Sequence, residues 1–187
     1  MKTLATMLAV LVLTCSTLAE QRRGRARYGD AGTWTLNVGV AIPQGDHKDL
    51  GFDSMIMLGG DYSLGPMGPG ANGTSYVGLL AIAGQGNGSL HSRTFGVHYG
   101  VLLNFGGTRS ESALNFRFQG GIYNTRLSDG FEIDETSFGG LIAIVWKPQR
   151  RGERGISGEL GFYSMPKVGS IDNNGWYIAV GIPLGGR

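Results

Sequence analysis

The sequence predicts an all-β protein, an eight-stranded antiparallel up-and-down barrel. Apolar residues fall on every second position in eight segments, turn-forming residues separate these segments, and no long helical period lies between them. An even number of antiparallel strands can close into a cylinder that has no unpaired edge. The expected strands cover residues 34–42, 54–64, 75–84, 92–104, 111–125, 136–147, 155–164 and 175–184.

The composition suits a single domain with an unusual surface. Charged residues make up 16% of the 187 residues, below the roughly 25% of ordinary soluble domains, so a large part of the surface is expected to avoid water. The 34 glycines show no triplet period, which excludes collagen. The net charge of +2 supplies no basic surface for nucleic acid.

The N-terminus resembles a secretory signal peptide. Lys2 supplies the positive start, residues 4–13 form an apolar stretch, and Thr17-Leu18-Ala19 is a small-residue cleavage site. We therefore expect residues 1–19 to be removed. Cys15 is the single cysteine, so the mature chain would have no disulfide.

Residues 20–33 are expected to be a basic disordered linker that precedes the barrel domain at residues 34–187. Four arginines lie between positions 22 and 27. A solvated linker is the plain interpretation, and contact with anionic lipid head groups or cell-wall polymer is the alternative.

Residues 34–42 show the alternation most clearly. The side chains at even positions are all apolar, whereas those at odd positions are Thr, Asn, Gly and Ala. Three strands are harder to orient. In 54–64 the better apolar face turns Asp61 inward, and the segments 75–84 and 136–147 are apolar on both faces.

The apolar face is expected to look outward. It carries bulky rings, including Trp34, Phe95, Phe116, Phe118 and Trp176. The lumen of an eight-stranded barrel is narrow and side chains fill it, so this many rings would overpack it. Glycine, small and polar residues fit better inside. An apolar exterior on a closed barrel is the arrangement of a transmembrane β-barrel.

Several rings lie near strand ends, where a membrane barrel meets the lipid–water boundary. The expected aromatic girdle consists of Trp34, Tyr62, Trp146 and Trp176. The simpler interpretation is that aromatic residues prefer strands in general.

The chain resembles the small outer-membrane β-barrel superfamily of OmpA-type, OmpX-type and opacity-like proteins. The resemblance rests on the signal peptide, the eight alternating segments and the closing strand at residues 175–184. It implies a Gram-negative outer membrane, with lipid, lipopolysaccharide and the barrel-assembly machinery as partners. Members commonly end in an aromatic residue, whereas this chain ends Leu184-Gly185-Gly186-Arg187.

The same resemblance implies that both termini lie in the periplasm. The loops expected on the outside, where an extracellular ligand could bind, are 43–53, 85–90, 126–134 and 165–173. The periplasmic turns would be 65–72, 105–109 and 148–153.

Two charges fall in mid-strand on the expected inner face. Neither Arg117 nor Glu159 is tolerable alone in a narrow lumen, because breaking a buried pair costs about 3–5 kcal/mol. We expect them to pair across the lumen, in a network drawn from Gln119, His98, Asn37 and Asp61. Such a network would plug the lumen, and a gated pore for small ions is the alternative.

No catalytic residue is expected. Some small outer-membrane barrels resemble lipid A-modifying enzymes with a Ser/His/acid arrangement, but the neighbours His91 and Ser92 point to opposite faces. His47, with Asp46 and Asp49, is interpreted as a solvated loop and not as a metal site. No metal or other cofactor is therefore expected.

The sequence favours a monomeric outer-membrane barrel with a structural, adhesive or surface-interaction role. The alternative is a soluble, secreted, lipocalin-like barrel whose apolar face encloses a ligand.

Overall fold

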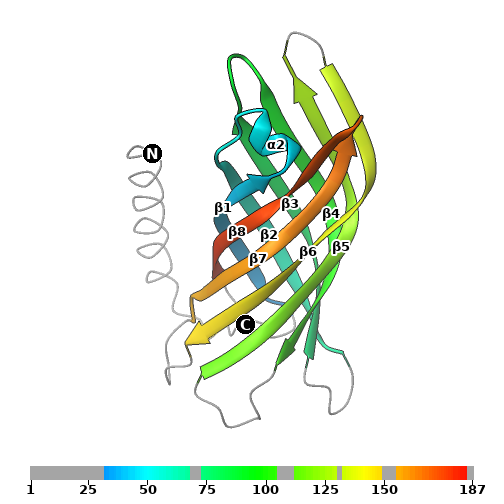
Figure 1. Ribbon diagram of the computed structural model, residues 1–187. Helices are drawn as coiled ribbons and strands as arrows, with labels where there is room; N and C mark the ends of the chain where they lie inside the picture. Colours follow the sequence, from blue (N-terminus) through cyan, green and yellow to red (C-terminus); the bar gives the residue numbers. More distant parts are fainter. Residues whose placement is uncertain (1–31, 68–72, 105–111, 130–131, 149–154, 185–187) are drawn as a thin grey trace.

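The computed structural model describes residues 32–67, 73–104, 112–129, 132–148 and 155–184. These residues form a closed, eight-stranded, all-antiparallel barrel in which each strand pairs with its sequence neighbours and β1 pairs with β8 (Figure 1). The predicted fold class is confirmed. The strands are β1 Trp34–Gln44, β2 Met55–Pro66, β3 Gly73–Gln85, β4 His91–Asn104, β5 Ser112–Ser128, β6 Glu132–Pro148, β7 Ser157–Val168 and β8 Ile171–Leu184.

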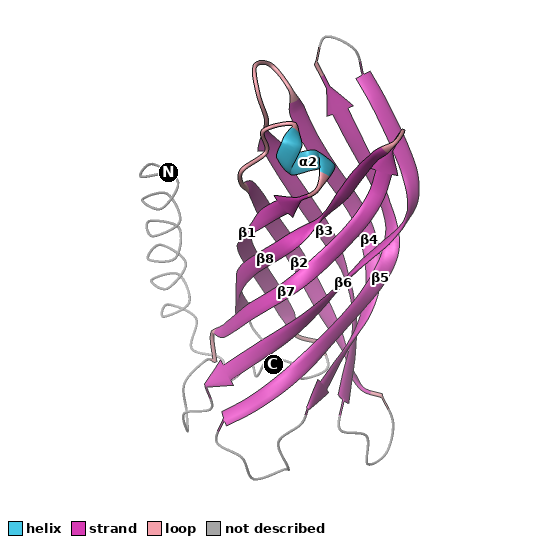
Figure 2. Cartoon of the chain, in the orientation of Figure 1, coloured by secondary structure: helices cyan, strands magenta, loops and turns pink. Residues whose placement is uncertain are grey.

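One short helix, α2 (Asp46–Asp49), lies between β1 and β2 (Figure 2). The helix was not expected from the sequence. We call the barrel end that carries it the helix end. The other end, where β1 begins and β8 finishes, is the terminal end. Among the described residues, no helix is both long and apolar enough to cross a membrane. The expected signal peptide at 1–19 lies outside the described residues, as does nearly all of the expected linker.

The strands are longer at the helix end than the sequence pattern predicted. The expected loops 126–134 and 165–173 are largely strand, because β5 continues to Ser128, β6 starts at Glu132, and β7 and β8 pair as far as Val168 and Ile171. Residues 132–138 continue the ladder while exposed to water, and Met165 and Val168 belong to an extension that is partly buried. Polarity at these positions therefore did not signal a loop.

The apolar stripe faces outward. Phe118, Trp176 and Phe95 are 44%, 51% and 57% exposed on the outside of the barrel, and Phe116 on the same face is half-buried by its neighbours. Inward-facing positions of the strands are buried, among them Asn37, Thr94, Arg117 and Glu159.

The structure orients the three strands that the pattern left open. Asp61 faces inward on β2, as the better apolar face of that strand suggested. On β3 and β6, one of two apolar faces points into the lumen and the other outward. Their inward, buried side chains are Tyr76, Leu80, Ile82, Leu141, Ala143 and Val145.

In the described part of the chain, four tyrosines lie in the lumen, each directly opposite a glycine on the neighbouring strand. The pairs are Tyr76–Gly100, Tyr123–Gly96, Tyr163–Gly175 and Tyr177–Gly161. A Cβ added at any of these glycines would come within 3.0 Å of the facing tyrosine side chain. The missing side chain therefore leaves the space in which the ring lies. Glycine was expected inside, but the tyrosines that it accommodates make the lumen more aromatic than the overpacking argument allowed.

Changing Gly96 to alanine tests this complementarity. The new methyl group would lie 2.4 Å from the Tyr123 ring and 2.3 Å from the backbone oxygen of Ile122. Because overpacking costs about 1–3 kcal/mol, we expect the variant to unfold at lower urea concentration in detergent micelles, followed by tryptophan fluorescence. Gly60→Ala is the control, since a Cβ there meets nothing within 4 Å. Equal midpoints for the two variants would contradict the packing role.

Candidate functional site

The centre of the lumen is organised around the guanidinium of Arg117, which projects inward from β5 and is 3% exposed. Its Nη1 donates to both carboxylate oxygens of Glu159 on β7, at 2.8 and 3.1 Å, and its Nη2 donates to Asp61 on β2. Its Nε donates to the Tyr76 hydroxyl on β3 at 2.7 Å. All three nitrogens of the guanidinium thus donate a hydrogen bond.

Arg117 joins strands that are not neighbours in the barrel. β5 pairs with β4 and β6, whereas Asp61 belongs to β2 and Glu159 to β7. The two ion pairs therefore cross the lumen in different directions. An arginine suits this position because its planar fork satisfies two carboxylates at once.

The two carboxylates have further donors around them. Asp61 accepts from Asn37 Nδ2 at 2.6 Å and contacts His98 Nε2 at 2.8 Å. Glu159 accepts from the hydroxyl of Tyr177 on β8. Buried carboxylates are costly unless paired and hydrogen-bonded, and each of these two has at least two partners.

Gln119 occupies the next inward position on β5 and extends the network through tyrosines. Its Oε1 accepts from Tyr76 at 3.4 Å, and its Nε2 donates to Tyr123 at 3.0 Å. All six residues expected in the lumen network are buried there. Sequence reasoning missed Tyr76, Tyr123 and Tyr177, because a tyrosine in an alternating strand gives no sign of which group its hydroxyl meets.

We call this group of side chains the lumen cluster. It draws on seven of the eight strands. Its members are Asn37, Asp61, Tyr76, His98, Arg117, Gln119, Tyr123, Glu159 and Tyr177. Two carboxylates face one guanidinium, and the His98 ring, charged only when protonated, contacts one of them. The arrangement braces opposite walls of the barrel and fills its middle with fixed polar groups.

A second buried polar site lies at the helix end. His47 of α2 is fully buried. Its Nδ1 lies 2.8 Å from the backbone oxygen of Asp172 and its Nε2 lies 3.1 Å from Ser92 Oγ. Asp172 in turn donates its backbone N–H to the Asp46 side chain at 2.9 Å. The His47 and Phe52 rings pack at 5.1 Å.

The expectation that His47 lies in a solvated loop is therefore wrong. The short helix turns the imidazole down into the barrel mouth, where Phe52 covers it, and the residues beside it in sequence stay near the surface. Ser92 does face inward, opposite to His91, but its partner comes from 45 residues earlier in the chain. No group of three or more potential metal ligands occurs among the described residues.

Below His47, three further buried polar side chains form a small set. Thr94 and Thr125 hydroxyls lie 3.0 Å apart, and Asn173 Nδ2 donates to both at 3.1 and 3.3 Å. Together with α2 and Phe52, they close the lumen at the helix end.

The expected girdle residues lie on the outside of the barrel. Trp34, Trp146 and Trp176 are about half exposed, and the Trp34 and Tyr62 rings contact each other at 5.2 Å. Trp34, Tyr62 and Trp146 lie near the terminal end of their strands, whereas Trp176 pairs with Ile42 toward the helix end. Whether they meet a lipid boundary stays a prediction.

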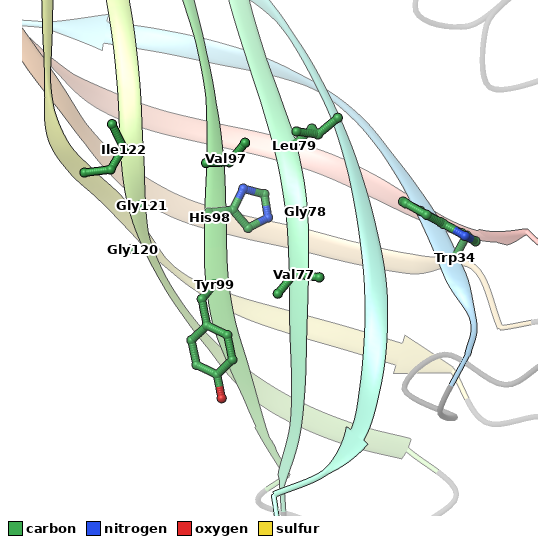
Figure 3. A pocket seen from close by; sticks show the side chains of 10 residues that line it. All are labelled: Trp34, Val77, Gly78, Leu79, Val97, His98, Tyr99, Gly120, Gly121 and Ile122. Atoms are coloured by element: carbon green, nitrogen blue, oxygen red, sulfur yellow. The ribbon is translucent and has the colours of Figure 1, made fainter.

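The outer wall also carries a shallow apolar groove of about 550 Å³ (Figure 3). Its side chains include Val77, Leu79, Val97 and Tyr99, and Gly120 borders it. His98 borders it from the same strand but turns toward the lumen. The groove therefore belongs to the apolar exterior of the barrel and does not expose the polar side chains of the lumen cluster.

Comparison with solved structures finds chains of similar fold. The chain is similar to Neisserial surface protein A, with a TM-score of 0.60 and 9% identity, over 82% of this chain and 97% of that one. It also matches the N-terminal β-barrel domain of Pseudomonas aeruginosa OprF, with a TM-score of 0.49 and 7% identity, over 82% of this chain and 98% of that one.

No family model and no curated protein matches the sequence. The resemblance stated from the sequence therefore holds at the level of the fold.

Replacing Arg117 by methionine tests the lumen cluster. The variant would leave two buried carboxylates without their cation, which costs about 3–5 kcal/mol, so its urea midpoint should fall steeply. Arg126→Met is the control, since the Arg126–Glu132 pair is exposed and such pairs contribute about 0–1 kcal/mol. Unfolding in micelles, followed by tryptophan fluorescence, measures both. Equal midpoints would contradict a bracing role.

The His47 contact predicts a pH-dependent closure of the helix end. Burial lowers the pKa of His47, and this outweighs the Asp172 carbonyl and the Asp46 carboxylate, which act to raise it. A lowered pKa means that the closed state favours the neutral ring. The stabilisation of the closed helix end is therefore complete above the ordinary histidine pKa of about 6.5. It is lost as the pH falls below that value.

Hydrogen exchange of residues 45–54 measures this closure. Protection, corrected for intrinsic exchange rates, should be lower at pH 5 than at pH 7.5. In His47→Gln, which cannot titrate, the protection should be low and should not change between these pH values. A pH response that persists in this variant would assign the effect to another group.

Proposed function

We propose that the protein is a bacterial outer-membrane β-barrel with a structural or surface-interaction role and a lumen filled by its own side chains. One observation carries the proposal, namely an apolar exterior around a polar, ion-paired interior. In water this arrangement would expose the wrong face, whereas a bilayer favours it.

The apolar exterior is extensive. Soluble monomers rarely expose contiguous apolar patches larger than a few hundred Å². Here large hydrophobic side chains on all eight strands are more than a third exposed. They include Ile56, Leu58, Val77, Leu79, Phe95, Val97, Tyr99, Phe118, Ile122, Ile142, Ile144, Leu160, Trp176 and Ile178. A strand tilted about 45° needs about 9–11 residues to cross the hydrocarbon layer, and each strand has at least 11.

The fold supports a definite orientation. The resemblance stated from the sequence implies that both termini lie in the periplasm, and β1 begins and β8 finishes at the terminal end. We place the helix end outside, so that α2 and the long β5–β6 hairpin are presented to the surroundings. Lipid, lipopolysaccharide and the barrel-assembly machinery are then the expected partners, and the protein is expected to work as a monomer.

The proposal includes no enzymatic activity. His47 and Ser92 do form a hydrogen-bonded pair of the kind that activates a serine hydroxyl. Both side chains are fully buried, and Phe52 packs against the His47 ring, so a substrate has no path to the Ser92 hydroxyl. The pair instead fastens α2 to the barrel wall.

The two alternatives are less well supported. A lipocalin-like barrel would enclose its ligand with its large apolar face, but here Phe95, Tyr99 and Trp176 lie outside. An ion pore would require a path through the lumen. Arg117, Glu159 and Tyr177 occupy its middle, and His47 with Phe52 closes its mouth.

Cell fractionation with site-directed labelling tests location and orientation together. The full chain, in a Cys15→Ser background, should be recovered in outer membranes after expression in a Gram-negative host. Asp129→Cys, at the β5–β6 hairpin, should react with a membrane-impermeant maleimide on intact cells. Met67→Cys, exposed at the opposite end, is the matched control and should react only after lysis. A soluble protein without detergent would contradict the proposal, and reversed labelling would contradict the orientation.

A further inference from the structure

The part of β6 nearest the helix end has a partner strand on one side only. β6 pairs with β5 along its whole length, from Ser112–Pro148 to Ser128–Glu132. It pairs with β7 only over residues 140–146. No strand in the described part of the chain pairs with residues 132–139 on the β7 side. Gly139 is buried and still lies beside Ser164 and Met165 of β7. The barrel wall therefore ends in a seven-residue sheet edge at residues 132–138, which we call the β6 edge.

β7 leaves this edge because its chain turns inward. Its pairing with β8 shifts register between Met165 and Val168, and Pro166 between them has no N–H to donate. Met165, Pro166 and Val168 are all buried, and Met165 and Val168 belong to the hydrophobic cluster that includes Tyr123 and Leu127. The end of the β7–β8 hairpin thus packs over the lumen and leaves β6 uncovered. The long β5–β6 hairpin projects beside it (Figure 1).

Apart from its charge, the β6 edge has none of the features that usually prevent a further strand from pairing. Natural edges are blocked by charged side chains, especially lysine, and by proline, a bulge or a covering element. Residues 132–138 contain no proline and no lysine, and their pairing with β5 is regular. Every residue from Glu132 to Phe138 is exposed, with Ile133 at 56% and Phe138 at 71%.

The edge carries a marked negative charge. Glu132, Asp134 and Glu135 lie within four positions. Glu132 pairs with Arg126 at 2.6 Å, and Asp134 accepts from Asn124 at 3.3 Å. Among the ion pairs of the described residues, none involves Asp134 or Glu135.

This charge argues against a second copy of the chain as the occupant. Two β6 edges side by side would bring six carboxylates together, and the symmetric antiparallel register centred on Glu135 places that residue opposite itself. Like charges directly opposite each other destabilise a strand pair. A strand that carries lysine or arginine would instead gain from the same carboxylates.

We propose that the β6 edge binds an extended, basic segment of a partner protein as an additional strand. Main-chain hydrogen bonds would supply the pairing. Successive residues of β6 point to opposite faces, so Asp134 and Phe138 lie on one face of the edge and Ile133 and Glu135 on the other. Each face of the partner strand would therefore present a basic side chain to a carboxylate and an apolar side chain to Ile133 or Phe138. The proposal specifies the surface-interaction role given above. Because binding is measured on purified protein, it can fail or succeed independently of the fractionation experiment.

The test uses the full chain in micelles of an uncharged detergent and a fluorescent peptide, Lys-Lys-Val-Val-Lys-Lys-Val-Val, which places lysine and valine on both faces of a strand. Fluorescence anisotropy is the readout. Alternate N–H groups of a strand point to opposite sides. Two further peptides therefore carry N-methyl groups on every second residue, in the two possible phases. We expect one phase to weaken binding at least ten-fold and the other to change it less than two-fold. Equal affinities for the two phases would overturn the proposal, because ionic attraction alone does not distinguish them.

Two protein variants locate the site. Asp134→Asn combined with Glu135→Gln should weaken binding at least five-fold. Asp49→Asn combined with Asp53→Asn also removes two exposed carboxylates at the helix end, and should leave binding within two-fold of the parent. Equal losses would overturn the proposal. A dimer of the unliganded protein that the peptide dissociates would show a second copy at the edge, which also contradicts the proposed occupant.

Discussion

The ion pairs of Arg117 with Asp61 and Glu159 are the interaction on which the rest of the barrel depends. The outer face of a closed barrel packs against no other part of the barrel. Interactions inside the lumen must therefore hold the strands in place. Arg117 does this by joining β5 to β2 and β7, neither of which pairs with β5. Because each charge is buried, removing any one partner leaves another charge unpaired and destabilises the whole cluster.

Around this centre, tyrosine rings fill the narrow lumen at positions that face glycines. Each inward tyrosine faces a glycine on the neighbouring strand, so the ring occupies the space that a side chain at the glycine position would fill. Three of the tyrosines then use their hydroxyls in the lumen cluster. The same glycines therefore allow both the packing and the hydrogen bonding that surround Arg117.

The helix end is built differently from the middle of the barrel. There α2 places His47 against Ser92, and the β7–β8 hairpin bends over the lumen. Closing the mouth in this way removes β7 from the wall and leaves β6 with a free edge. Closure of the lumen and exposure of a sheet edge thus have one structural cause, the inward turn at Pro166.

The sequence by itself determined the strand number, the closed antiparallel fold and the outward direction of rings such as Phe118 and Trp176. These follow from a period of two and from the size of side chains, which are local properties. It also identified the six polar residues of the lumen network, because a charge on an inner face needs a partner. It did not predict the tyrosines of that network, the burial of His47 or the free edge of β6. The tertiary structure decided these, because each depends on which distant residue lies opposite: a glycine facing a ring, Ser92 facing an imidazole, and a neighbouring strand that turns away.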